Sequence, residues 1–495
     1  MKYRFLLYIL ILSLFSACKE SVEIVRYSQD EIAIFPDYKD VTIPYNIAPL
    51  CFSVEGDIRT ALIVKGENDS ITMTSSDGNF NIPKKKWRNL LERTKGKDLQ
   101  VTISRELSEG WEATAPFSIH VSEDAIDPYL VYRRINPGYG LWNRMGLYQR
   151  CLEDFEEDKI YDNSEGRGNC INCHSFCNGN PEKWQVHIRA RYGGTYLFDE
   201  DVQSTLKLKD KSKGNPVYPS WHPDGELIAY SNNKTFFFIH TTNQNRWEVM
   251  DDGSDVFVAD IKTGEQYRSP LTSSDSSYET FPCFSPDGKS LFFCSAETPS
   301  DLLVGFDSIQ YNICRIEFDA SLRAFGERVD TIYNAKVDGG SASFPRISPD
   351  GRWLCFTRSQ YGNFSICHRD ADLCLIDLSL VQGSLSEMPA YTMLEKANSD
   401  QVDSYHSWSR NSRWIVFSSK RDDSIYTKPY FAHVDSDGNV SKAFVLPQRN
   451  AKNHYDLEMD SYNIPELISG KIDIERIKLD KSQGTPNPQE VISVN

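Results

Sequence analysis

The chain has 495 residues, enough for one large domain and a smaller one. Its net charge of −16 argues against binding to nucleic acid or to an anionic membrane surface, because both would repel it. The 12 cysteines are scattered along the chain, which does not suggest a small disulfide-stapled scaffold. Composition therefore predicts an acidic globular protein and leaves its function open.

The first residues predict export from the cytoplasm. Lys2 and Arg4 precede an apolar run over 5–15, which is too short to span a bilayer and is typical of a secretory signal. The signal ends in Phe-Ser-Ala-Cys at 15–18, which resembles a bacterial lipobox. The resemblance implies cleavage after residue 17, lipidation of Cys18 and, with Lys19 next, an anchor in the outer membrane on its periplasmic or cell-surface face. An ordinary signal with an incidental cysteine is the alternative.

The region that follows, 18–124, is predicted to be a small β-sandwich-like domain. Segments rich in β-branched residues alternate with turns, and 84–95 has the pattern of a short amphipathic helix. Nothing in this region indicates a function.

An internal repeat organises the rest of the chain. YPSWHPDGELIAYS, FPCFSPDGKSLFFCS, FPRISPDGRWLCFT and YHSWSRNSRWIVFSS each read as a strand, a tight turn and an apolar strand. The turns centre on four residues at intervals of 63, 63 and 61: Asp224, Asp287, Asp350 and Asn411. Such regular spacing indicates repeated supersecondary units.

A second mark, a strand closing on an acidic residue, recurs behind each turn. The closing residues are 61, 57, 60 and 58 apart and include a fifth copy without a Pro-Asp-Gly turn: Asp199, Asp260, Glu317, Asp377 and Asp435. Units of this length predict four-stranded sheets stacked radially, an all-β propeller over 125–480 followed by a tail over 481–495. The repeats resemble those of TolB-type propellers. We expect six blades, one of them closed by both ends of the region, with seven as the alternative.

A C-x-x-C-H motif, Cys170-Ile171-Asn172-Cys173-His174, stands before the fifth copy. In c-type haem attachment two thiols bind the haem vinyl groups, and the adjacent histidine binds the iron. The motif therefore predicts one covalent haem c on Cys170 and Cys173, with His174 as iron ligand. A redox-active dithiol, a structural zinc site and a disulfide involving Cys177 are the alternatives.

Repeat spacing places the missing turn of this blade between 163 and 175, so we expect the motif in a loop insertion over 163–180 on the propeller rim. His187, on the strand that follows, is the first candidate for the sixth iron ligand. His222, Met145 and Met250 are further candidates.

These patterns predict a lipid-anchored c-type haem propeller that transfers electrons to a redox partner in the cell envelope. The alternative is a non-enzymatic TolB-like propeller that binds a protein or glycan, with the motif as a disulfide or a remnant. The sequence contains no G-x-S-x-G elbow, H-E-x-x-H helix or P-loop. We therefore expect an electron carrier or binding protein more than a catalyst.

Overall fold

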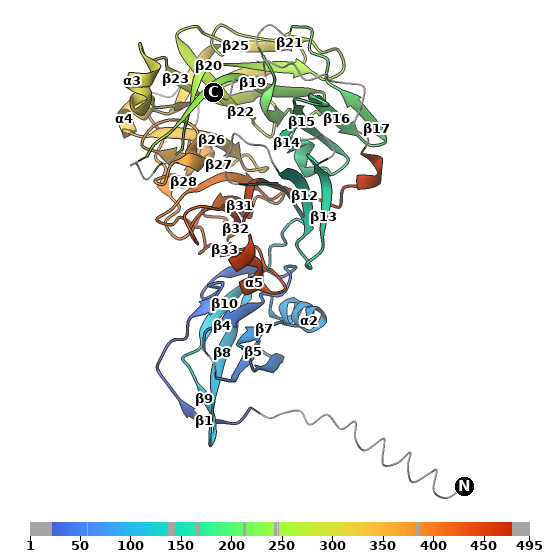
Figure 1. The fold of residues 1–495 in the computed structure, drawn as a ribbon. Coiled ribbons are helices and arrows are strands. Elements are labelled where there is room, and N and C mark those ends of the chain that lie inside the picture. The colour runs from blue at the N-terminus through green and yellow to red at the C-terminus, as the bar shows by residue number, and fades with distance from the viewer. Residues whose placement is uncertain are drawn as a thin grey trace, which may run out of the picture.

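The computed structural model describes residues 22–477 apart from 57, 137–143, 165–168, 211–213, 242–244, 246 and 382–386. The predicted signal, Cys18 and the tail over 481–495 lie outside the described residues. A propeller and a smaller N-terminal β-domain make up the molecule (Figure 1). In the part that is described, no helix is long and apolar enough to cross a membrane.

Over its described residues, the N-terminal domain contains two sheets and one helix. The three-stranded sheet is formed by β2 (Ile34–Phe35), β4 (Phe52–Val54) and β7 (Asn79–Phe80). The seven-stranded sheet is formed by β1 (Ile24–Tyr27), β3 (Thr42–Pro44), β5 (Thr60–Lys65), β6 (Ser70–Ser75), β8 (Lys97–Leu107), β9 (Gly110–Ala113) and β10 (Phe117–Ser122). The predicted helix is α2 (Lys84–Thr94), which buries Trp87, Leu90, Leu91 and Thr94 on one face, as its sequence period requires.

In the part of the propeller that the structure describes, the strands form six four-stranded antiparallel sheets, which confirms the predicted fold class and six blades. Blades one to three are β14 (Cys170–Phe176), β15 (Lys183–Arg189), β16 (Gly194–Asp199) and β17 (Val202–Thr205); β18 (Val217–Trp221), β19 (Leu227–Ile239), β20 (Trp247–Asp260) and β21 (Gln266–Tyr267); and β22 (Ser277–Phe284), β23 (Ser290–Glu297), β24 (Asn312–Asp319) and β25 (Ala324–Tyr333).

Blades four and five are β26 (Ser341–Ile347), β27 (Trp353–Ser359), β28 (Asp372–Asp377) and β29 (Thr392–Met393); and β30 (Asp403–Trp408), β31 (Trp414–Ser419), β32 (Lys428–His433) and β33 (Phe444–Val445). Blade six joins both ends of the propeller, as predicted. Its inner strand β34 (Ser461–Ile468) pairs with β11 (Tyr129–Ile135), which is followed by β12 (Met145–Cys151) and β13 (Glu157–Asp162). Short helices α3 (Leu302–Gly305), α4 (Ala335–Asp338) and α5 (Ala451–Leu457) lie between strands.

Every inner strand bends at the same position. One residue there has a left-handed φ of 50–53°, and a shift of strand register accompanies it: Cys173, Tyr218, Phe281, Phe344, Tyr405 and Ile464. Such a φ is costly for a non-glycine residue and persists only where the surrounding structure holds it. Its sixfold recurrence therefore identifies equivalent positions in all blades. The next residue is proline in four blades and histidine, His174 or His406, in two.

The aromatic members of this set form an arc of rings between consecutive blades. The ring centroids of Tyr218 and Phe281 are 4.4 Å apart, those of Phe281 and Phe344 4.2 Å, and those of Phe344 and Tyr405 4.6 Å. Because rings at these separations are in direct contact, the arc ties blades two to five together beside the propeller axis.

The hairpin of β19 and β20 is longer than its counterparts and reaches the neighbouring blades. Asp251 on β20 accepts hydrogen bonds from Asn233 (2.8 Å), Tyr311 (3.2 Å) and Asn363 (2.6 Å), which belong to blades two, three and four. Burial raises the pKa of Asp251 to about 6 despite these three donors. One carboxyl group thus links three blades.

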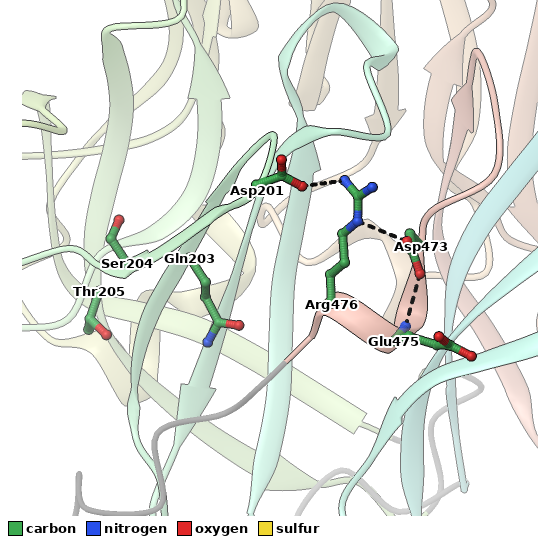
Figure 2. A pocket seen from close by; sticks show the side chains of 7 residues that line it. All are labelled: Asp201, Gln203, Ser204, Thr205, Asp473, Glu475 and Arg476. Atoms are coloured by element: carbon green, nitrogen blue, oxygen red, sulfur yellow. Dashed lines mark hydrogen bonds and ion pairs between the residues drawn. The ribbon is translucent and has the colours of Figure 1, made fainter.

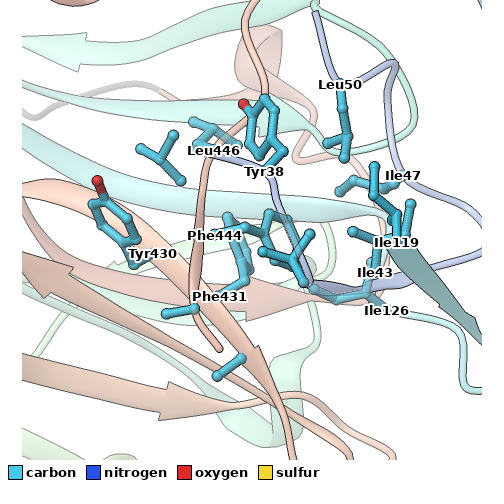
Figure 3. Packing of buried hydrophobic residues seen from close by; sticks show 14 of the residues in the cluster. Tyr38, Ile43, Ile47, Leu50, Ile119, Ile126, Tyr430, Phe431, Phe444 and Leu446 are labelled. Carbon is cyan, nitrogen blue, oxygen red and sulfur yellow. The ribbon is translucent and has the colours of Figure 1, made fainter. Parts of the chain in front are cut away.

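The two domains share one apolar core (Figure 3). Tyr38, Ile43 and Leu50 of the N-terminal domain pack with Phe431 and Phe444 of blade five. The N-terminal domain is therefore fixed to the propeller through blade five.

Candidate functional site

An axial cavity of about 450 Å³ opens between the six inner strands. All six blades line it, with residues from the segments 173–179, 218–223, 284–286, 344–349, 405–410 and 464–467. Its volume lies in the range of roughly 300–1,000 Å³ that is usual for small-molecule sites. The cavity combines aromatic walls with a few polar side chains, which makes it the first candidate for a binding site.

One ring of equivalent positions, two residues after the left-handed position, gives the cavity its polarity. Four of its members are small and uncharged and two are charged: Ser175, Ser220, Cys283, Ser407, Arg346 and Glu466. All except Cys283 line the cavity. The ring is therefore asymmetric in charge although the backbone repeats six times.

Hydrogen bonds between blades explain how the members of this ring are held. The Ser220 hydroxyl accepts the backbone N–H of Phe284 at 2.9 Å. In the equivalent contact, Oε1 of Glu466 accepts the backbone N–H of Phe176 at 2.9 Å. A serine hydroxyl is enough to accept this hydrogen bond between blades. The second carboxylate oxygen of Glu466 is therefore not needed for the contact.

Arg346 and Glu466 lack ion-pair partners among the described residues. Nη1 of Arg346 donates to the carbonyl of Pro345 at 3.0 Å. Burial raises the pKa of Glu466 to about 7, against the opposing effects of the Phe176 N–H and the Arg346 charge. The two charged groups therefore influence each other without forming a direct ion pair, and both line the cavity.

The C-x-x-C-H motif forms β14, the inner strand of blade one, and not the predicted loop insertion on the rim. Cys173 occupies the repeated left-handed position, and His174 takes the place that proline has in four other blades. The turn of blade one follows at 177–180. The spacing estimate was wrong because Asn178 is only 21 residues before Asp199, so this blade has shorter strands and turns than the others.

The predicted ligands are buried in the blade. Burial raises the pKa values of the Cys170 and Cys173 thiols and lowers those of the His174 and His187 imidazoles to about 3. His187 lies on β15 opposite Asn172, and its Nδ1 hydrogen-bonds Thr195 Oγ1 at 2.9 Å. The thiols and imidazoles are therefore uncharged at neutral pH.

The other proposed iron ligands have separate roles. Met145 Sδ accepts the N–H of Ile171 at 3.0 Å, so this side chain does lie beside the motif. His222 Nε2 contacts the Gly288 carbonyl at 3.1 Å in the next turn, and Met250 belongs to β20. Across the described residues, no three His, Cys, Asp or Glu side chains are arranged to hold a metal ion. The described cysteines, including Cys177, are buried free thiols, so the disulfide alternative is not formed.

A second hollow lies on the outer edge of blade one, between β17 and the 3₁₀ turn Ile474–Arg476 (Figure 2). Arg476 pairs with Asp201 and with Asp473, both at 2.8 Å. These charges satisfy one another at an exposed surface, where ion pairs contribute little. The axial cavity is the stronger candidate.

Together the six sheets and the space between them define a six-bladed β-propeller protein with an axial cavity. No family model matches the chain. It is 32% identical over 78 residues to dipeptidyl-peptidase 5 of Porphyromonas gingivalis, which covers 16% of this chain and 10% of that protein. A 36% match over 75 residues to dipeptidyl-peptidase 5 of Porphyromonas endodontalis covers 15% and 9%. The chain thus matches about a tenth of the length of these peptidases.

Solved structures give more distant similarities. Prolyl oligopeptidase B from Galerina marginata has a TM-score of 0.36 at 13% identity, with 65% of this chain and 45% of that chain covered. A putative dipeptidyl aminopeptidase IV from Bacteroides ovatus has a TM-score of 0.31 at 13% identity, with 62% and 53% covered.

The two proteins that are similar in sequence show that the predicted function is wrong. They are peptidases, which contradicts a cytochrome c or haem protein of electron transfer and equally a non-enzymatic binding propeller. Neither function is retained. The comparisons do not test whether the cysteines carry a covalent group, so attachment at Cys170 and Cys173 stays a prediction.

Proposed function

We propose that the protein acts in peptide hydrolysis and that its axial cavity receives the peptide. The sequence match to two dipeptidyl peptidases carries this proposal, because it points to peptide chemistry independently of the fold. The cavity supports it through aromatic walls that can accept side chains and polar groups that can bind peptide ends.

The role proposed for the cavity is to bind the peptide. Trp221 and Trp408 line the cavity, and each indole N–H donates a hydrogen bond to a backbone carbonyl of the preceding blade. Trp221 donates to Ser175 at 3.2 Å, and Trp408 donates to Arg346 at 3.0 Å. These bonds fix both indole rings before a ligand arrives. Fixed rings reduce the entropy that is lost on binding.

Calorimetric titration of the full chain with the dipeptide Ala-Phe tests this proposal. We expect saturable binding with a micromolar to submillimolar Kd, and no heat from a neutral oligosaccharide of similar size. The variant Ser175→Trp places an indole in the cavity without removing a side-chain hydrogen bond, and should weaken binding by about tenfold or more.

Ser436→Trp is the matched control, since it adds the same ring to an exposed turn of blade five and should bind Ala-Phe as the unmodified chain does. Absence of binding to the unmodified chain, or binding of the oligosaccharide alone, would overturn the proposal.

Three expectations from the sequence accompany this proposal. The finer resemblance to TolB-type propellers and the lipid anchor on Cys18 at the outer membrane stay predictions of the sequence. A protein partner in the envelope likewise stays a prediction. An envelope location would give the cavity access to peptides outside the cytoplasm.

A further inference from the structure

We infer that the axial cavity recognises both charged ends of a short peptide, with Glu466 binding the free α-ammonium group and Arg346 the free α-carboxylate. This inference rests on the proposed function and adds the class of ligand: short zwitterionic peptides with both ends unblocked.

The asymmetry of the ring is the first observation. Among six equivalent positions, two carry charge, and the charges have opposite sign. Ser407 of blade five lies between them in blade order. A ligand that spans the cavity from blade four to blade six would therefore meet a cation at one end and an anion at the other.

The second observation is that Glu466 and Arg346 have hydrogen-bonding atoms that the fold does not use. Oε1 of Glu466 is used by the Phe176 N–H, and no described residue donates a hydrogen bond to its other oxygen. The guanidinium of Arg346 has five N–H donors, and its side-chain hydrogen bonds to the Pro345 carbonyl and to Cys283 use only some of them. An ammonium and a carboxylate supply the missing charge-assisted partners.

The surroundings favour these two groups over other charges in the cavity. His174 and His406 also line it, and burial lowers the pKa of each to about 3, so both are neutral near pH 7. Arg410 also lines the cavity, but it lies at the turn of blade five and outside the ring of equivalent positions. The raised pKa of Glu466 fits a carboxyl group that lacks a cationic partner in the unliganded protein.

Three ligands separate the two ends in calorimetric titrations: Ala-Phe, N-acetyl-Ala-Phe and Ala-Phe-amide. We expect each blocked peptide to bind the unmodified chain about tenfold or more weakly, because blocking leaves one partly buried charge unpaired. Glu466→Gln keeps an oxygen for the Phe176 N–H, so the blade contact survives. In this variant Ala-Phe and N-acetyl-Ala-Phe should bind equally, while the amide stays disfavoured.

Arg346→Gln should give the reciprocal result, with Ala-Phe and its amide equal and the acetylated peptide still disfavoured. Arg476→Gln removes a positive charge outside the axial cavity, on the outer edge of blade one, and should keep both preferences. Equal affinity of all three ligands for the unmodified chain would overturn the inference while leaving peptide binding intact. Absence of binding by any of them would remove the proposed function as well. Unchanged preferences in Glu466→Gln or Arg346→Gln would also overturn the assignment of ends.

Discussion

Replacing Phe281 with alanine is expected to lower the free energy of unfolding by about 3–5 kcal/mol. Phe281 is fully buried, and its ring lies between those of Tyr218 and Phe344 in the arc that joins consecutive blades. The substitution leaves a cavity where three blades meet, so the surrounding strands cannot collapse onto it without losing their register. Chemical denaturation followed by tryptophan fluorescence measures the change.

Phe236→Ala is the matched control for this substitution. Phe236 lies on the long hairpin and is 43% exposed, so removing its ring should change the free energy of unfolding by less than about 1 kcal/mol. Equal effects of the two substitutions would show that the arc of rings does not hold the blades together.

Replacing Asp251 with alanine is expected to cost about 2–4 kcal/mol. The carboxyl group accepts hydrogen bonds from Asn233, Tyr311 and Asn363, and its loss leaves three donors from three blades without their partner. Asp252→Ala changes the neighbouring residue, whose partner is the exposed Lys234, and should have little effect.

The cost of Asp251→Ala should also depend on pH. Burial raises the folded-state pKa of Asp251 from 3.8 to about 6, so the fold favours the neutral carboxyl group. The stabilisation is complete below the unfolded pKa and is lost as pH rises through about 6. The substitution should therefore cost up to about 3 kcal/mol more at pH 4 than at pH 8. A cost that rises with pH would contradict the burial of this group.

The repeat was predictable from the sequence because its turns are defined by local chemistry. Asp-Gly pairs such as Asp224-Gly225 favour tight hairpins wherever they occur, and the chain spaces them regularly. The interval between the turns predicted the size of a blade. The chain that remains on both sides of the repeats is long enough for one more blade, which predicted a blade built from both ends of the propeller. The arc of rings was not predictable, since it depends on which inner-strand residue adopts a left-handed φ.

The C-x-x-C-H motif was placed wrongly because its position was estimated from the turn-to-acid distances of the other blades, which are longer than that of blade one. His-Ser-Phe at 174–176 is similar to His-Ser-Trp at 406–408, which belongs to one of the four repeats that contain a tight turn. That match would have placed the motif on an inner strand. The short blade one, which has no Asp-Gly turn, concealed it. Glu466 was missed for a related reason: blade six closes with strands from both ends of the propeller, so its inner strand has no adjacent partner in sequence.

The structure of the full chain in complex with Ala-Phe tests the central claim most directly. We expect the dipeptide in the axial cavity, with its ammonium group against Glu466 and its carboxylate against Arg346. A peptide bound elsewhere on the molecule, or an axial cavity that stays free of peptide at saturating concentration, would contradict the account.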